Sequence, residues 1–123
     1  MSFFETYGNP VAKNMMGVVT ADQIQAGFVL AHLAGVEMYN KIGDRDACGF
    51  GWVDVYVDRT NSKQAKELIK AGFRKDYKPK CLSYWDPAKI PTQSVSVKEA
   101  GAEALATYLQ ALGLKAYAGS RLD

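Results

Sequence analysis

Histidine and cysteine are scarce in this chain, and so are the motifs that usually mark an active site. One histidine, His32, and two cysteines, Cys48 and Cys81, occur among 123 residues. A four-ligand zinc site within one chain would therefore need an Asp or Glu to complete it. No GxxxxGK[ST] loop, HExxH pair or Gly-x-Ser-x-Gly motif is present. The sequence predicts no metal and no cofactor, and it gives little support to catalysis.

Long hydrophobic runs are also missing. The longest nearly uncharged apolar run, from Ile24 to Val36, has 13 residues, whereas a membrane-spanning helix needs about 20. No secretory signal is visible, so we expect both cysteines to stay reduced inside a cell. The 48% hydrophobic and 23% charged residues are typical of a globular domain, and a net charge of +2 indicates no partner by itself. We expect one domain over residues 1–123, with no membrane contact.

The first strong pattern predicts a long helix over residues 20–43, after an N-terminal arm of residues 1–19. Thr20 and Gln23 fit a capping box at the start of this helix. One apolar stripe contains Ile24, Phe28, Ala31, Gly35, Met38 and Ile42, while Val29, Leu30, Leu33 and Val36 lie off it. A helix that is apolar on more than one face is covered on both sides. This favours a homo-oligomer formed through residues 20–42; in a monomer, the N-terminal arm would cover the second face.

Small residues recur on the same helix, and the only histidine lies among them. Gly27, Ala31 and Gly35, at a spacing of four, would allow close helix–helix contact. His32 has no Asp, Glu, Ser or Cys at helical spacing, so we expect a packed or surface side chain rather than a catalytic base.

Residues 48–58 give the clearest strand. Val53, Val55 and Val57 alternate with Phe50, Trp52, Asp54 and Tyr56. We expect the valines to face the helices and the other set to face away from them. The aromatic side chains would then pack on the N-terminal arm or a second subunit, or else form a platform on which nucleobases stack.

A second helix is predicted over residues 60–72, and a basic segment extends around it from residue 59 to 80. Asn61 or Ser62 would cap the helix, and Gly72 would end it. The basic side chains of the segment are Arg59, Lys63, Lys66, Lys70, Arg74, Lys75, Lys78 and Lys80, and only Glu67 and Asp76 oppose them. Such a cluster is typical of a solvated surface, and it is also the footprint of a phosphate-binding one.

The last third of the chain predicts a strand, a helix and a final strand. The first strand is Cys81–Trp85. Ser96 and Glu99 fit a capping box for the helix, Gly101 and Ala104 would let it approach the sheet closely, and Gly113 suits its left-handed end. A short strand over 114–118 follows. The whole order predicts an α+β fold: a three- to four-stranded sheet with helices on one face, like a split βαβ unit, plus the long N-terminal helix.

Three motifs support a family resemblance over residues 48–123. They are Cys48-Gly49-Phe50-Gly51-Trp52-Val53, the helix start Lys98-Glu99-Ala100, and the terminal Ser120-Arg121-Leu122-Asp123. They resemble a group of small proteins of tailed phages and prophages, in which a GF-[AG]-WV strand precedes a KEAxAxA helix and a terminal SR-[LM]-D. Many members carry Tyr-x-Gly-Gly where this chain has Tyr77-Lys78-Pro79-Lys80. The resemblance implies a phage-encoded protein in the cytoplasm of an infected bacterium, and it implies no catalytic residues.

The basic and aromatic residues predict a non-enzymatic protein that binds an anionic partner, nucleic acid or a small nucleotide. The resemblance implies that it is a phage accessory protein, which would act in host takeover or counter-defence. The predicted binding residues are Phe50, Trp52, Tyr56, Lys63, Lys66, Lys70, Arg74, Lys75 and Arg121. Arg121 would grip a phosphate or carboxylate, or else pair with a surface carboxylate of the chain. The alternatives are an oligomeric structural or protein-interaction protein, and an enzyme that uses Cys48 or the loop of Asp44 and Asp46.

Overall fold

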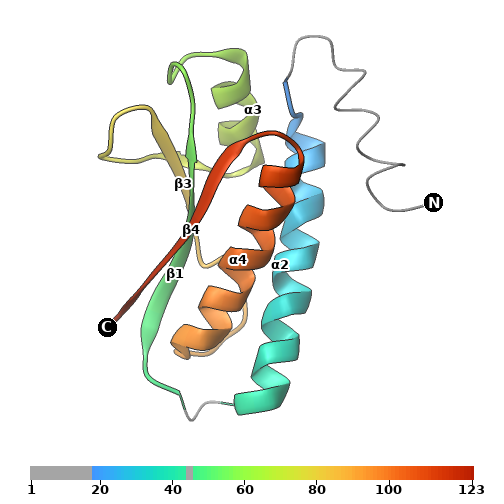
Figure 1. Cartoon of the computed structure of the whole chain (residues 1–123), viewed down its shortest axis with the longest axis vertical. Helices are drawn as coiled ribbons and strands as arrows, with labels where there is room; N and C mark the ends of the chain where they lie inside the picture. The colour runs from blue at the N-terminus through green and yellow to red at the C-terminus, as the bar shows by residue number, and fades with distance from the viewer. Residues whose placement is uncertain (1–17, 44–45) are drawn as a thin grey trace, which may run out of the picture.

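The computed structural model describes residues 18–43 and 46–123 (Figure 1). The elements are α2 (Ala21–Ile42), β1 (Gly49–Tyr56), α3 (Lys63–Ala71), β2 (Arg74–Lys75), β3 (Cys81–Trp85), α4 (Val95–Ala111) and β4 (Lys115–Leu122). The strands form one antiparallel sheet in the order β2-β3-β1-β4. From β1 onward this is the βαββαβ order of a ferredoxin-like, or split βαβ, fold. The predicted α+β class is confirmed; the N-terminal arm, apart from Val18 and Val19, lies outside the described residues.

The helices pack on one face of the sheet. Helix α4 contacts β1 and β4, α3 contacts β2 and β3, and α2 packs on α4 and α3. Figure 1 shows α4 lying between the sheet and α2. Val53 and Val55 of β1 are fully buried beneath the helices, as the alternation predicts. Phe28 of α2 contacts Tyr84 of β3, with stacked ring centres 4.3 Å apart, so α2, α3, α4 and the sheet share one core.

A capping residue determines where helix α2 begins, and small residues determine how closely it packs on the rest of the chain. Thr20 is the N-cap, and the predicted capping box with Gln23 is formed. A Cβ at Gly27 would lie 2.6 Å from the ring of Tyr108 in α4, so only glycine permits this approach. A Cβ at Gly35 would lie 2.7 Å from the Cβ of Ala88, in the loop before α4. The close helix contact expected from these glycines is thus made within the chain.

Helix α4 starts differently from the prediction. Its N-cap is Ser94, whose Oγ accepts from the amide of Val97. The predicted box of Ser96 and Glu99 is wrong, because the Ser96 amide donates to Asp46 (2.7 Å) and Glu99 accepts from Ser120 (2.7 Å). The left-handed end at Gly113, with φ of 98°, is confirmed.

Close approach of α4 to the sheet depends on glycines of the strand rather than of the helix. A Cβ at Gly51 would lie 2.7 Å from the carbonyl oxygen of Lys98 in α4, and one at Gly49 would meet Val95. The expectation that Gly101 and Ala104 let α4 approach the sheet is wrong, because Gly101 packs against Ala88 and Ala104 lines a groove between α2 and α4.

Two strands depart from the sequence prediction. Strand β2 has only two residues and was not expected. Strand β4 continues to Leu122 instead of ending at residue 118, because it pairs with the whole of β1, from Tyr56 opposite Lys115 to Gly49 opposite Leu122. Among the described residues, no helix is long and apolar enough to cross a membrane.

Candidate functional site

The face of the sheet turned away from the helices carries most of the exposed aromatic residues of the strands. Residues directly opposite each other on antiparallel strands point to the same face. Trp52 lies opposite Trp85 and Gly119, Phe50 opposite Arg121, and Asp54 opposite Ser83 and Tyr117. We call this surface the open face; it consists of Phe50, Trp52, Asp54, Tyr56, Arg74, Cys81, Ser83, Trp85, Lys115, Tyr117, Gly119 and Arg121.

One end of the open face, which we call the tryptophan end, consists of Phe50, Trp52, Trp85 and Arg121. The Trp52 and Trp85 rings are stacked with centres 4.7 Å apart, and Phe50 meets Trp85 edge-on at 6.2 Å. The Arg121 guanidinium lies 5.3 Å from the centre of the Phe50 ring. Because Trp85 keeps 45% of its surface exposed, this end offers an accessible ring beside a cation.

The Trp52 ring is held from two further sides. A Cβ on Gly119 would lie 2.5 Å from it, so the indole lies directly over the β4 backbone. Its Nε1–H donates to Asp54 Oδ2 at 3.3 Å. Trp52 is therefore a fixed support, and Trp85 is the more exposed ring of the pair.

The opposite end of the open face, which we call the tyrosine end, consists of Tyr56, Tyr117 and Lys115. The two tyrosine rings meet edge-on with centres 6.0 Å apart, and Tyr117 is 55% exposed. Tyr56 and Lys115 also line a cavity of about 400 Å³ together with Ser62 and Lys63 at the start of α3. Desolvation raises the pKa of the Tyr56 phenol above its ordinary value, with a further contribution from Asp54, so the hydroxyl remains neutral.

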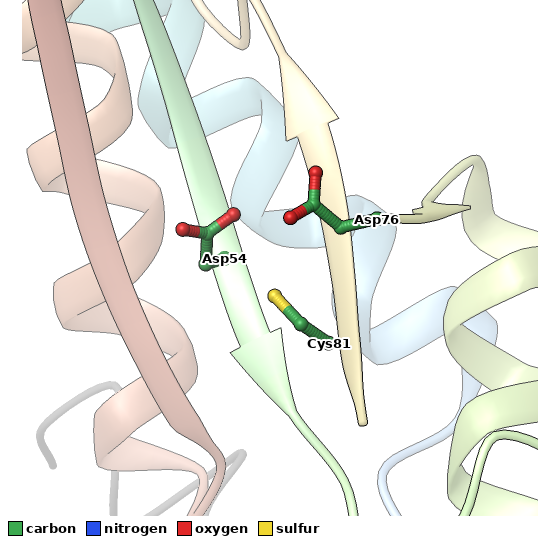
Figure 2. Close-up of side chains that lie close together, drawn as sticks. All are labelled: Asp54, Asp76 and Cys81. Carbon is green, nitrogen blue, oxygen red and sulfur yellow. The ribbon is translucent and has the colours of Figure 1, made fainter. Parts of the chain in front are cut away.

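A charged cluster lies between the two ends (Figure 2). Figure 2 shows Asp54 on β1, Cys81 on β3 and Asp76 in the β2–β3 connection pointing toward one another. The Lys78 ammonium forms an ion pair with Asp54 Oδ2 and lies 3.7 Å from Asp76 Oδ2. The hydrogen bond to Asp54 raises the pKa of Lys78, and desolvation raises the pKa of the Cys81 thiol to about 11. The cluster therefore consists of two carboxylates that share one lysine, with a net charge of −1, beside a protonated thiol.

This cluster is also the grouping, among the described residues, that could offer three metal ligands. The candidate ligand atoms of Asp54, Asp76 and Cys81 all lie within 4.8 Å of one another. Asp54 Oδ1 is buried and has no hydrogen-bond partner among the described residues. However, the Lys78 ammonium already contacts Oδ2 of both aspartates, so a metal ion would have to displace it.

The structure separates the predicted binding residues into two groups. Phe50, Trp52, Tyr56, Arg74 and Arg121 share the open face, and Lys63 joins the tyrosine end through the cavity. Lys66 and Lys70 belong to α3, which packs on the helical side through Ala65 and Leu68. Lys75 lies opposite Leu82, a core residue, and so points to the helical side as well. Within the described ranges, no carboxylate forms an ion pair with Arg121.

Trp85, Tyr117 and Lys115 were missed because only the strand register places them beside β1. For the aromatic residues of β1 itself, the sequence contains one further local signal. The octamer from Cys48 to Val55 follows the RNA-recognition pattern K/R-G-F/Y-G/A-F-V-x-F/Y at Gly49, Phe50, Gly51 and Val53, with Trp52 at an aromatic position. It departs from that pattern at Cys48 and Val55.

The other residues considered for catalysis have structural roles or lie apart from the open face. Asp46 accepts from Ser94 Oγ (2.9 Å) and the Ser96 amide, and these hydrogen bonds, Ser96 foremost, lower its pKa to about 2. It supports the first turn of α4, whose N-cap is Ser94, and is too weakly basic for proton abstraction near neutral pH. The His32 Nδ1–H donates to the Ala88 carbonyl at 2.8 Å. Cys48 is exposed just before β1, and Asp44 lies outside the described residues.

A second exposed apolar region lies on the far side of the molecule, between α2 and α4. A groove of about 820 Å³ is lined by Leu30, Leu33, Met38 and Ala104, among others. Leu33 and the neighbouring Val29 are 57% and 60% exposed. Val29, Leu30 and Leu33 are among the residues that the sequence pattern placed off the main apolar stripe of the long helix, whereas it placed Met38 on that stripe.

Comparisons with protein-family models, curated proteins and solved structures gave no match. The chemistry of the open face and of the α2–α4 groove therefore carries the functional interpretation.

Proposed function

We propose that this protein binds an anionic ligand that carries nucleobases, either nucleic acid or a nucleotide, on the open face, and that it catalyses no reaction there. The proposal retains the context implied by the resemblance: an accessory protein of a tailed phage that acts in the bacterial cytoplasm, in host takeover or counter-defence. The observation that carries it is the accessible ring of Trp85, supported by Trp52 and set beside the cations around Phe50.

The energetics of such a surface favour a nucleobase. A base stacked on an aromatic side chain contributes about 1–3 kcal/mol, largely irrespective of its identity. Arg121, Arg74 and Lys115 add positive charge to the same face, while Lys78 offsets the charge of Asp54. A phosphate close to the rings would thus meet mainly positive charge. Lys66, Lys70 and Lys75 contribute only to the overall field in this proposal.

The test is a fluorescence titration of the purified protein with a single-stranded oligonucleotide at several salt concentrations. We expect quenching of tryptophan emission, an affinity that falls steeply with salt, and a loss of about 5- to 100-fold for Trp85→Ala. Arg121→Ala should also weaken binding, whereas the matched control Lys66→Ala, on the helical side, should have a much smaller effect. If binding is undetectable, or equal in Trp85→Ala and the unmodified protein, the proposal is wrong.

A second candidate function is an oligomeric structural or protein-interaction protein, and the exposed groove between α2 and α4 favours it. In that case Leu33→Lys should lower the native mass, measured by light scattering, because a charge would enter the subunit interface. A native mass equal to one chain in both proteins, at low and high salt, would exclude self-association through this groove.

A further inference from the structure

We infer that the ligand of the open face is a single-stranded nucleic acid that spans both aromatic ends, with about four nucleotides in contact, rather than a mononucleotide. This inference rests on the proposed function and narrows it. It follows from the spacing of the two ends, from their chemical repetition and from the neutral character of the surface between them.

The spacing of the two ends exceeds the reach of one nucleotide. The exposed rings of the two ends are Trp85 and Tyr117. Trp85 lies opposite Trp52 and Tyr117 lies opposite Asp54, so the two rings are two positions apart along β1 and belong to the strands on either side of it. With a rise of about 3.3 Å per residue and about 4.8 Å between neighbouring strands, their backbones lie about 12 Å apart. The cations of the two ends, Arg121 and Lys115, are six residues apart on β4 and so lie about 20 Å apart. Stacked nucleic acid advances about 3.4 Å per nucleotide, so a strand that reaches both rings and both cations has about four to six nucleotides.

Each end repeats the same chemistry. The tryptophan end has the exposed Trp85 ring with Arg121, and the tyrosine end has the exposed Tyr117 ring with Lys115 and the nearby Lys63. A ring beside a cation matches the two parts of a nucleotide, a base and a phosphate. Two such units on one continuous face match a polymer of nucleotides. Because bases in a duplex are already stacked and paired, their faces are not available to these rings.

The surface between the two ends does not repel a phosphate chain. Asp54 is only 8% exposed, and its carboxylate pairs with Lys78. Lys78 comes from the β2–β3 connection and reaches Asp54 near Cys81, so it places a cation midway along β1. Lys78 balances only one of the two carboxylates of this cluster, Asp54 and Asp76. Arg74, which lies opposite Ser83 on the same face, supplies the second cation. A strand that passes from one end to the other therefore meets two cations for two carboxylates.

A length series tests the inference. The probes are thymidine monophosphate, oligothymidylates of two, four and eight nucleotides, the matching oligouridylates, and a blunt duplex, each measured by tryptophan fluorescence at fixed salt. We expect the affinity to rise at least about 10-fold between two and four nucleotides, and much less between four and eight. Either the deoxyribose or the ribose series can show this rise, and the stronger one identifies the natural polymer.

Single substitutions at the two ends provide the second arm. Trp85→Ala and Tyr117→Ala should each weaken binding of the four-nucleotide probe by about 5- to 100-fold. Both side chains are largely exposed, so folding should be preserved, which circular dichroism can verify. Val29→Ala is the control, because Val29 is a 60% exposed apolar residue on α2, on the helical side of the sheet.

The outcomes separate the two proposals. If the monophosphate binds as tightly as the four-nucleotide probe, or if Tyr117→Ala leaves that probe unaffected, the spanning strand is wrong while nucleobase binding on the open face stands. Equal affinity for the duplex also overturns the inference. If no probe binds, both proposals fail together.

Discussion

Trp52 and Trp85 face each other across the β1–β3 pair, and their stacked rings lie 4.7 Å apart. The electronic transitions of two indoles at this separation couple and give an exciton couplet, a paired positive and negative signal, in the far-ultraviolet circular dichroism spectrum. The pair therefore reports on the tryptophan end of the open face without any added label.

The two tryptophans should differ in their effect on stability. Trp52 lies over Gly119 and donates to Asp54, whereas Trp85 is 45% exposed. Both alanine variants should lose the paired signal, but Trp52→Ala should lower the free energy of unfolding by about 1–3 kcal/mol and Trp85→Ala by clearly less. Urea unfolding followed by circular dichroism measures this. Equal losses would mean that Trp85 is also a packing residue.

Lys78 should stabilise the fold as long as residue 54 carries the negative charge that the lysine pairs with. Lys78→Met leaves the mostly buried Asp54 carboxylate without its cation, which should cost about 1–3 kcal/mol of unfolding free energy. Adding Asp54→Asn to that variant removes the isolated charge and should recover part of the loss. A urea-denaturation double-mutant cycle measures the coupling. Losses that simply add would show that the pair contributes nothing at the surface of β1.

Acid should remove the stabilisation that Asp46 gives to α4. Its pKa is lowered from 3.8 to about 2 in the folded chain, so the unfolded state binds the proton more readily. The stabilisation is present above about pH 4 and disappears as the pH falls toward 2. Asp46→Asn should therefore have a lower melting temperature at pH 7, and the difference should vanish near pH 2. A difference that is independent of pH would contradict this role.

Packing of α2 on α4 should not tolerate a side chain at Gly27. A Cβ there would come within 2.6 Å of Tyr108 and 2.7 Å of Leu105. Gly27→Val should lower the unfolding free energy by about 1–3 kcal/mol. Ala26→Val, at an exposed neighbouring position, controls for the helix propensity of valine. The loss should be independent of protein concentration, since the contact is made within one chain; a concentration-dependent loss would place Gly27 between subunits.

Predictions from the sequence were most accurate for features that depend on the residues of one helix or strand alone. The alternation in β1 correctly divided the buried valines from Phe50, Trp52 and Tyr56, because a strand has a period of two whatever it pairs with. The capping box at Thr20 was likewise local and correct.

Features that depend on a distant partner could not be read in the same way. Ser96 has the better local capping pattern, but Asp46, 50 residues earlier, takes its amide, and Ser94 becomes the cap. Strand β4 is long because β1 pairs with it throughout, and that pairing brings Tyr117 and Lys115 to the open face. Lys66 and Lys70 were grouped with the aromatic residues by charge alone, although α3 packs on the other side of the sheet.

Because β4 lies at the edge of the sheet, its two cations also bear on aggregation. An edge strand presents unpaired backbone groups that can recruit the edge of another copy and start aggregation. Gln110 already covers one such acceptor by donating to the Ala116 carbonyl at 2.6 Å. Lys115 and Arg121 place like charges near the two ends of the strand, so two β4 edges brought together would repel. Replacing both cations should thus reduce solubility as well as ligand affinity, and the first effect would appear even without any ligand.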